Sequence, residues 1–241
     1  MCLSKIPFLV AGTIGAYITL TPPHPQASPT EYPRNVTAYE RILFSSAARF
    51  CAGNLKLLSG VGGLLEICVI LASRWPTHPL SRKVLEALVP GSLYRTNKIG
   101  YSAAFLLGCS IAVIAGFVRY KCYRELERLY TFELTIQQDH RLVTTGLYAY
   151  VRYLSYTSGI ACSVGLGVCL ASSGSWLKEC GVLDTFAGKF AAWLYVGYTL
   201  WGTVAFVIRA PLEDALMKEQ FGEEWNKWAQ RVPYRLIPYV F

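Results

Sequence analysis

Long uncharged runs alternate with short, charged segments along this chain, and the runs are apolar on all sides rather than striped. Three of them, 99–118, 153–177 and 191–208, contain no Asp, Glu, Lys or Arg. Each is close to the ~20 apolar residues that an α-helix needs to cross the hydrocarbon layer of a membrane. Each therefore predicts a transmembrane helix.

Two further stretches nearer the N-terminus predict membrane helices. Ile6 to Leu20 precedes a Pro-rich connector without a small-x-small cleavage site, which favours a retained anchor over a signal peptide. Leu57 to Ser73 is apolar apart from Glu66, which is either a functional carboxylate or, as we favour, a paired residue facing the bundle. Ile42 to Cys51 either extends this helix or forms a separate turn. We expect an all-α, polytopic membrane helix bundle of about five transmembrane helices.

The composition supports a membrane protein and argues against other classes. Of the 241 residues 53% are hydrophobic and only 16% charged, whereas a soluble domain has about 25% charged residues. The net charge is +8, but the cations flank the apolar runs, which suits lipid headgroups better than nucleic acid. Eight scattered cysteines without a Cys-x-x-Cys pair, and three histidines, predict neither a disulfide framework nor a metal centre.

The charges also predict an orientation. Basic residues gather between positions 119 and 152 and again after 208, and two spans separate these segments, so both are expected on the cytosolic side. The basic residues between 74 and 98 then lie on the opposite side, against the same tendency. Asn35-Val36-Thr37 matches the glycosylation acceptor pattern but is expected on the cytosolic side and unmodified.

Two polar blocks lie at the ends of the last two apolar runs. The first extends from His140 to Tyr148 and continues through Arg152 to Tyr156, with a turn expected at Thr144–Gly146. Ionisable residues at the ends of membrane helices are functional-site candidates. Before this block, apolar residues at helical spacing predict that Arg119 to Leu134 lies along the membrane surface.

The second block follows Arg209, where the last apolar run is expected to end. Arg209 and Glu213 are four residues apart and share a helical face, so they form either part of a site or an ordinary salt bridge. An apolar stripe then continues at steps of three or four and is expected to dock a tail helix on the membrane or on the first block; it comprises Met217, Phe221, Trp225, Trp228 and Val232.

Together the two blocks resemble the isoprenylcysteine carboxyl methyltransferase family, a group of membrane methyltransferases. The family pattern is roughly His-x-Leu-Val-Thr-x-Gly-x-Tyr-x-x-x-Arg-His-Pro-x-Tyr, then an apolar helix hairpin, an Arg, a Glu-Glu pair and Phe-Gly. The C-terminal run from Val232 to Pro238 is similar to that of fungal-looking members. The matching residues are His140, Leu142, Val143, Thr144, Gly146, Tyr148, Arg152, Tyr156, Arg209, Glu213, Phe221 and Gly222.

The chain departs from the family pattern inside the motif. Where the family has Arg-His-Pro, this chain has Arg152-Tyr153-Leu154, and the Glu-Glu pair is Glu213-Asp214. Loss of the proline changes how the backbone enters the span, and a phenol replaces the histidine as hydrogen-bond donor.

The resemblance implies a cofactor and a set of site residues. S-adenosylmethionine would be the cofactor, and Arg209 would bind the substrate's carboxylate. A carboxylate is already deprotonated at neutral pH, so no general base and no metal is required. The resemblance places a methyltransferase core at 119–241, after N-terminal transmembrane helices at 1–118. The implied cofactor-binding residues are His140, Arg141, Leu142, Val143, Tyr148, Tyr153, Leu154, Ser155, Tyr156 and Glu213.

The resemblance implies methylation of the C-terminal carboxylate of prenylated cysteine, in proteins or in small prenylcysteine acids. The enzyme would lie among membrane lipids, in the endoplasmic reticulum, with its site facing the cytosol. Two alternatives remain open. One is a paralogue that binds cofactor or prenyl lipid without turnover, suggested by Tyr153-Leu154. The other is a sterol-type membrane reductase, whose C-terminal helices have a similar arrangement.

Overall fold

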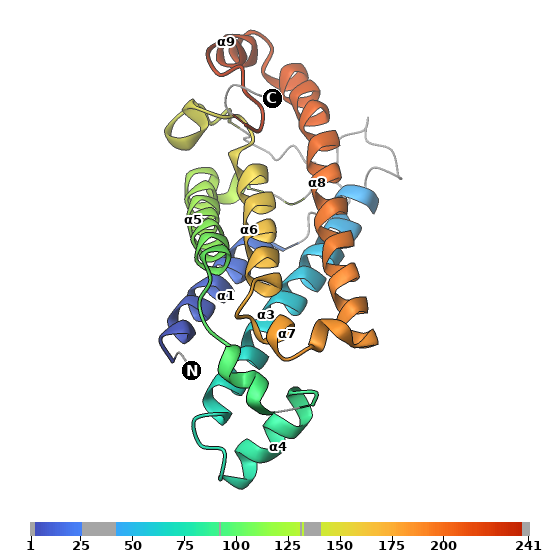
Figure 1. Ribbon diagram of the computed structural model, residues 1–241. Helices are drawn as coiled ribbons and strands as arrows, with labels where there is room; N and C mark the ends of the chain where they lie inside the picture. The colour runs from blue at the N-terminus through green and yellow to red at the C-terminus, as the bar shows by residue number, and fades with distance from the viewer. Residues whose placement is uncertain (1–2, 26–41, 92, 131, 133–140, 238–241) are drawn as a thin grey trace.

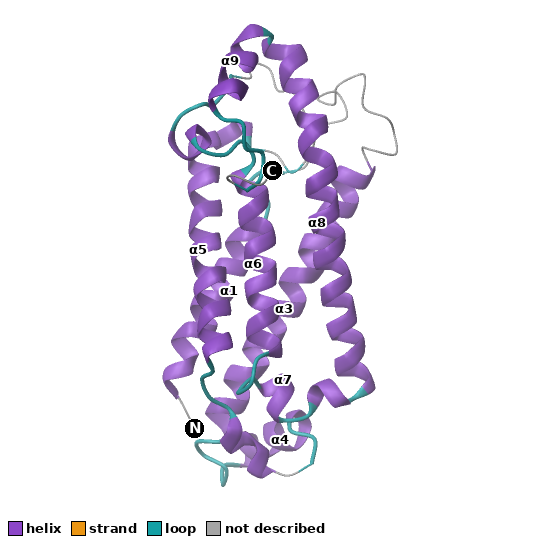
Figure 2. Ribbon diagram, turned by 45° about the horizontal axis from the view of Figure 1, so that its top comes forward, coloured by secondary structure: helices purple, strands orange, loops and turns teal. Residues whose placement is uncertain are grey.

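The computed structural model describes residues 3–25, 42–91, 93–130, 132 and 141–237, and every regular element in these ranges is a helix. Five helices are long and apolar enough to cross a membrane, which confirms the predicted all-α bundle and its spans. They run lengthwise through the molecule (Figures 1 and 2). They are α1 (Ile6–Leu20), α3 (Ala48–Ala72), α5 (Ala103–Leu126), α6 (Leu154–Ala171) and α8 (Phe186–Phe221).

Shorter helices close the two ends of the bundle (Figure 1). The end that holds the N-terminus contains η1 (Leu3–Lys5), α4 (Pro79–Leu88), η4 (Leu93–Lys98), α7 (Trp176–Glu179) and η7 (Val182–Asp184). The other end contains η5 (Glu127–Leu129), η6 (Gly146–Ala149) and α9 (Glu223–Arg231). A π-helical turn, η3 (Ile42–Ala47), runs directly into α3, so the stretch from Ile42 to Cys51 extends that helix.

Glycine allows α5 and α6 to pack closely, and these two helices contact each other more than any other pair does. A Cβ atom on Gly108 would lie 2.6 Å from the carbonyl oxygen of Gly165, and one on Gly165 would lie 2.6 Å from that of Gly108. Small residues allow such approach in lipid, where dispersion contacts replace the hydrophobic effect between helices. This crossing packs the first half of α5 against the second half of α6. At the other end of the pair, Arg119 Nη1 of α5 donates to the Ser155 carbonyl and holds the start of α6 against α5.

We expect Gly165→Ala to lower the melting temperature of the detergent-solubilised protein. The new methyl group would meet a backbone atom that cannot move aside, and overpacking of this kind costs about 1–3 kcal/mol. Gly197→Ala on α8 is the matched control, because nothing lies within 4 Å of a Cβ atom built there. Alanine favours helix over glycine, so the control should be neutral or stabilising. Equal melting temperatures for both variants would contradict this packing.

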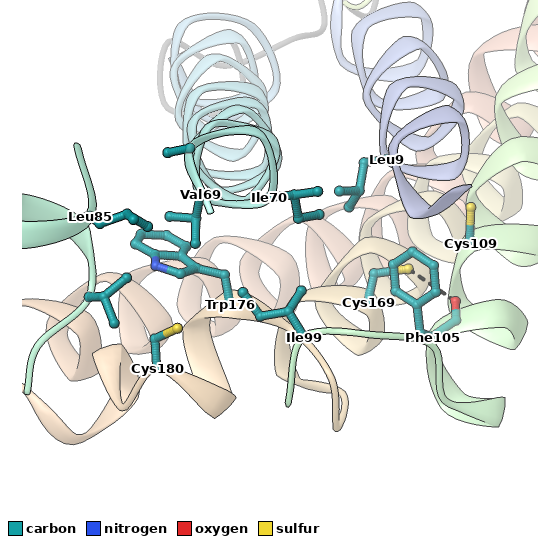
Figure 3. Packing of buried hydrophobic residues seen from close by; sticks show 12 residues of the cluster. Leu9, Val69, Ile70, Leu85, Ile99, Phe105, Cys109, Cys169, Trp176 and Cys180 are labelled. Atoms are coloured by element: carbon teal, nitrogen blue, oxygen red, sulfur yellow. Dashed lines mark hydrogen bonds between the residues drawn. The ribbon is translucent and has the colours of Figure 1, made fainter. Parts of the chain in front are cut away.

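The end that holds the N-terminus is a closed core. Leu9, Val69, Ile70, Phe105 and Trp176 are buried together there, from the three membrane helices α1, α3 and α5 and from α7 (Figure 3). A buried ion pair lies at the same end: Lys5 Nζ is 2.6 Å from Glu66 Oε1 and donates to the Gly174 carbonyl at 2.8 Å. Glu66 is therefore a paired residue facing the bundle, as favoured from the sequence.

The helix α8 differs from the other four. Only 11% of its apolar stretch is buried inside the protein, against 39% to 44% for the others, so it faces lipid on most sides. The apolar run ends at Arg209, but the helix itself continues through Pro211 to Phe221, so Arg209 and Glu213 share one helical face as predicted. Gly222, with φ of 52°, then reverses the chain into α9.

The structure also corrects the predicted surface segment. Arg119 to Leu126 forms the last two turns of α5, so the spanning helix continues without a break where a separate surface helix was expected. Two sequence predictions lie outside the described residues: the glycosylation acceptor at Asn35 and the cofactor-binding role of His140.

Candidate active site

Two stacked tyrosines at the start of α6 connect this helix to α8. The ring centroids of Tyr153 and Tyr156 are 5.4 Å apart, with 13° between the ring planes. Tyr156 stacks in turn on Phe206 of α8, at 4.6 Å and 14°. Through these three rings the first polar block lies beside the second.

The tyrosine hydroxyls meet two adjacent carboxylates of α8. Tyr156 donates a hydrogen bond to Glu213 Oε2 at 2.6 Å, and Tyr153 donates one to Asp214 Oδ1 at 2.8 Å. Successive side chains of an α-helix point in directions about 100° apart, so each carboxylate has its own set of partners.

Glu213 is the partner of Arg209. Its Oε1 accepts from Arg209 Nη2 at 2.7 Å and from Nε at 3.0 Å. Arg209 Nη1 donates to the carbonyl of Phe132, and the guanidinium lies 5.5 Å from the centroid of the Tyr156 ring. The Arg209 side chain is only 5% exposed, so the pair is largely desolvated and Glu213 neutralises its charge.

Asp214 is shared by two arginines. Its Oδ1 is 2.9 Å from Arg152 Nη1, and its Oδ2 accepts from Arg235 Nε at 2.7 Å. The side chains of Asp214 and Arg152 are each 7% exposed, whereas that of Arg235 is 34% exposed. One buried carboxylate therefore connects the start of α6, the end of α8 and the C-terminal segment.

The C-terminal segment is also held through its backbone. The amides of Arg152 and Tyr153 donate to the carbonyls of Tyr234 and Arg235, at 3.1 and 2.8 Å. Thr157 Oγ1 donates to the Leu236 carbonyl at 2.6 Å. The chain from 232 to 237 is thus attached along the first turn of α6, and its position depends on that of the tyrosines.

The two departures from the family motif contact each other. The phenol at position 153, which stands where the family has histidine, reaches the carboxylate at 214, which stands where the family has the second glutamate. An aspartate is one methylene shorter than a glutamate, and a tyrosine reaches further than a histidine. In this chain the two departures are thus joined directly by one hydrogen bond.

Two phenols of the first polar block, Tyr148 and Tyr153, are held in their neutral form. Burial raises the pKa of Tyr153, and the nearby charges of Glu213 and Asp214 raise it further. Burial likewise raises the pKa of Tyr148 well above its usual value. Neither phenol is a base at neutral pH, so these groups bind and orient.

The rest of the first block packs beneath the tail helix. Tyr148 is buried with Cys122, Trp228 and Val232, and three predicted cofactor residues pack against this cluster: Leu142, Val143 and Leu154. Trp228 Nε1 donates to the carbonyl of Tyr148 at 3.2 Å. The predicted docking of the tail on the first block is confirmed, and the expected turn occurs at Gly146, with φ of 61°.

Two buried nitrogen donors beside this network, Arg152 Nε and Trp225 Nε1, lack an acceptor among the described residues, and the Tyr148 hydroxyl likewise has no partner there. The Arg152 guanidinium lies 5.6 Å from the centroid of the Trp225 ring, so the two side chains are neighbours. Buried donors of this kind are normally satisfied, and each unpaired one costs free energy. These two N–H donors would suit a ligand with several acceptor oxygens, such as a nucleoside that carries an amino-acid carboxylate.

The remaining predicted residues lie in different environments. Arg141 is exposed, and His140 lies outside the described residues. Ser155 is buried, and its carbonyl accepts a hydrogen bond from Arg119 Nη1. Arg119 was not predicted as a site residue. Its signal in the sequence was the same as that of Arg209: each is the first charged residue after a long uncharged run.

An apolar cavity of about 80 Å³ adjoins the Arg209 end of this network. It lies between α3, α6 and α8, and both Arg119 and Arg209 line it. It shares Ser163 and Thr199 with a wider apolar groove of about 770 Å³ that extends along α8 towards Trp176. The charged groups therefore lie at one end of a continuous apolar surface.

Comparison with known proteins agrees with the resemblance seen in the sequence. Residues 106–178, less than a third of the chain, match the model of the isoprenylcysteine carboxyl methyltransferase family. A probable protein-S-isoprenylcysteine O-methyltransferase of Oryza sativa subsp. indica is 24% identical over 71% of this chain and 80% of its own length. Protein-S-isoprenylcysteine O-methyltransferase B of Arabidopsis thaliana is 27% identical over 55% of this chain, which spans 58% of that relative.

A third relative belongs to another class. A probable 7-dehydrocholesterol reductase of Acanthamoeba polyphaga mimivirus is 27% identical over 44% of this chain and 20% of its own length. The kinship with fungal members, suggested by the C-terminal run, stays a prediction.

Proposed function

We propose that this chain is an S-adenosylmethionine-dependent membrane methyltransferase that esterifies the carboxylate of a prenylated cysteine, in proteins or in small prenylcysteine acids. The observation that carries the proposal is the position of Arg209, a buried guanidinium at the end of an apolar cavity. A molecule with a carboxylate at one end and a long apolar chain matches that arrangement. The family match and the names of the plant relatives support the same reaction.

The residues around Tyr153 and Trp225 would hold the cofactor. The unpaired donors Arg152 Nε and Trp225 Nε1 suit its carboxylate and ribose oxygens, and the Glu213 carboxylate can accept from its amine or hydroxyls. The residues proposed from the first block are His140, Arg141, Leu142, Val143, Tyr148, Tyr153, Leu154, Ser155 and Tyr156. When bound, S-adenosylmethionine supplies a methyl group on a cationic sulfur, whose bond to the methyl carbon breaks as a carboxylate oxygen takes that carbon.

The protein's own groups would orient the reactants and exclude water from the site. The planar guanidinium of Arg209 can bind a carboxylate through two parallel hydrogen bonds, which fixes the direction of its oxygens. No proton moves in the methyl transfer, so the site needs no general base, and neutral tyrosines are compatible with the reaction. The apolar walls between α6 and α8 exclude water, and holding reactants close and in line accounts for much of the rate gain in such reactions.

The orientation proposed from the basic segments places this end of the bundle in the cytosol. The cofactor would then enter from the cytosol, whereas the prenyl chain would enter from the bilayer along the groove beside α8. The endoplasmic reticulum is the proposed location.

A labelled methyl donor tests the proposed function. Membranes that contain the protein are expected to transfer methyl groups to N-acetyl-S-farnesylcysteine, as an ester that base hydrolyses to volatile methanol. Phosphatidylethanolamine is the comparison acceptor, because methyl groups on its nitrogen survive base. Base-stable label on the phospholipid, with none on the farnesylcysteine, would contradict the proposal.

The mimivirus relative favours a second candidate, a sterol-type reductase that takes hydride from a nicotinamide cofactor. This candidate predicts that a sterol with a ring double bond is reduced with consumption of NADPH. A related protein that binds cofactor or prenyl lipid without turnover remains the third reading, and it predicts S-adenosylmethionine binding without label in either acceptor.

A further inference from the structure

Arg119 is a buried cation without a carboxylate partner among the described residues. It lies on α5 and is 3% exposed. Its Nε donates to the Tyr123 hydroxyl at 3.0 Å, and its Nη1 donates to the Ser155 carbonyl. Among the described residues Nη2 has no hydrogen-bond acceptor.

Other buried cations of the bundle are neutralised. Lys5, Arg152 and Arg209 each lie 2.6 to 2.9 Å from a carboxylate oxygen. Around Arg119 there are instead three aromatic rings, Tyr123, Tyr130 and Phe132, with centroids 5.3 to 5.5 Å from the guanidinium carbon. Such rings attract a cation but carry no net charge, so they offset only part of the cost of burying it.

Arg119 lines the same cavity as Arg209. Phe132 connects the two: its ring faces the Arg119 guanidinium at 5.5 Å, and its carbonyl accepts from Arg209 Nη1. The cavity lining away from this end is mainly apolar. An anionic head at the arginines and an apolar tail along α3, α6 and α8 would fill it.

We propose that Arg119 binds the carboxylate of an amphiphilic acid in this cavity, opposite Arg209. Arg209 with Glu213 has no net charge, so this pair alone does not balance an incoming anion. Arg119 supplies the missing positive charge. The identity of the acid as a prenylcysteine rests on the proposed function. The anion site itself rests on the burial of Arg119 and on its lack of a carboxylate partner among the described residues. In this reading Arg119 is a substrate-binding residue rather than only a connection between α5 and α6.

Binding measured without cofactor tests the proposal. The full-length protein in lipid nanodiscs is titrated with N-acetyl-S-farnesylcysteine and with its neutral carboxamide. The wild type should prefer the acid, and Arg119→Gln should reduce that preference about 10- to 100-fold, the range expected for losing a hydrogen bond to a charged group. Arg119→Lys should retain part of it. Arg124→Gln is the matched control, since Arg124 lies on the same helix and is exposed.

The preference for acid over amide separates the possible roles. If Arg119 only connects two helices, Arg119→Gln weakens both ligands equally, and the proposal is overturned. A wild type that binds acid and amide alike also overturns it. If the wild type prefers the acid but transfers no methyl group, the proposed function fails and the anion site stands. If methyl transfer occurs but Arg119→Gln keeps the full preference for the acid, the proposed function stands and the anion site at Arg119 is overturned.

Discussion

Asp214→Asn is expected to destabilise the protein and to release its C-terminal segment from α6. The substitution keeps the shape of the side chain but leaves Arg152 buried without a counter-charge, and it weakens the hold on Arg235. Breaking a buried ion pair costs about 3–5 kcal/mol, and the low end applies here because Arg235 is partly exposed. A lower melting temperature and faster proteolysis after residue 231 are the expected measurements.

Glu224→Gln is the control for this experiment. Glu224 lies on the neighbouring helix α9, is exposed, and has no ion pair in the described part of the chain. The substitution Glu224→Gln removes one negative charge, as Asp214→Asn does, but leaves the contacts of Asp214 unchanged. If Asp214→Asn had the same melting temperature and the same rate of proteolysis as Glu224→Gln, the contact of Asp214 with Arg152 and Arg235 would not hold the C-terminal segment.

Arg209→Ala is expected to reduce methyl transfer to a farnesylated cysteine acid by about 100-fold or more. Truncating one partner of a desolvated charge pair costs about 2–5 kcal/mol, and here it removes both the partner of Glu213 and the proposed carboxylate ligand. Arg209→Lys keeps the charge but not the planar fork, so an intermediate rate is expected. Initial rates in membranes, at equal amounts of protein, give the comparison.

A folding defect must be distinguished from a loss of binding. The melting temperature of Arg209→Lys should stay near that of the wild type, because a cation still faces Glu213. If Arg209→Ala were folded and methylated the acid at the wild-type rate, Arg209 would not bind the carboxylate.

The sequence predicted the bundle well because its signals are local. An uncharged run of bilayer length is read from consecutive residues, and the five spans are confirmed. The ends of the spans were less accurate. At Arg119 a charge was taken as the end of the spanning helix, whereas α5 continues to Leu126. At Arg209 the apolar run ends, but α8 continues, as the helical face shared with Glu213 implied. A charge ends an apolar run without ending backbone hydrogen bonding.

The contacts of the site were beyond the sequence because they join distant residues. Arg209 with Glu213 is a helical neighbour pair, and the spacing predicted it. The contact of Tyr153 with Asp214 joins positions 61 residues apart, and only the packing of α6 against α8 brings them together. Considered singly, the two substitutions put the motif in doubt. Considered together, they form one hydrogen bond that keeps its two ends connected.

Photo-crosslinking of tritiated S-adenosylmethionine to the protein in nanodiscs tests most directly whether the start of α6 and the end of α8 form one cofactor site. The label should map to peptides from 141–156 and 209–228, and unlabelled S-adenosylhomocysteine should prevent it. Label confined to the peptides of α1, α3 and α4, or label that the competitor does not reduce, would contradict a cofactor site built from these two blocks.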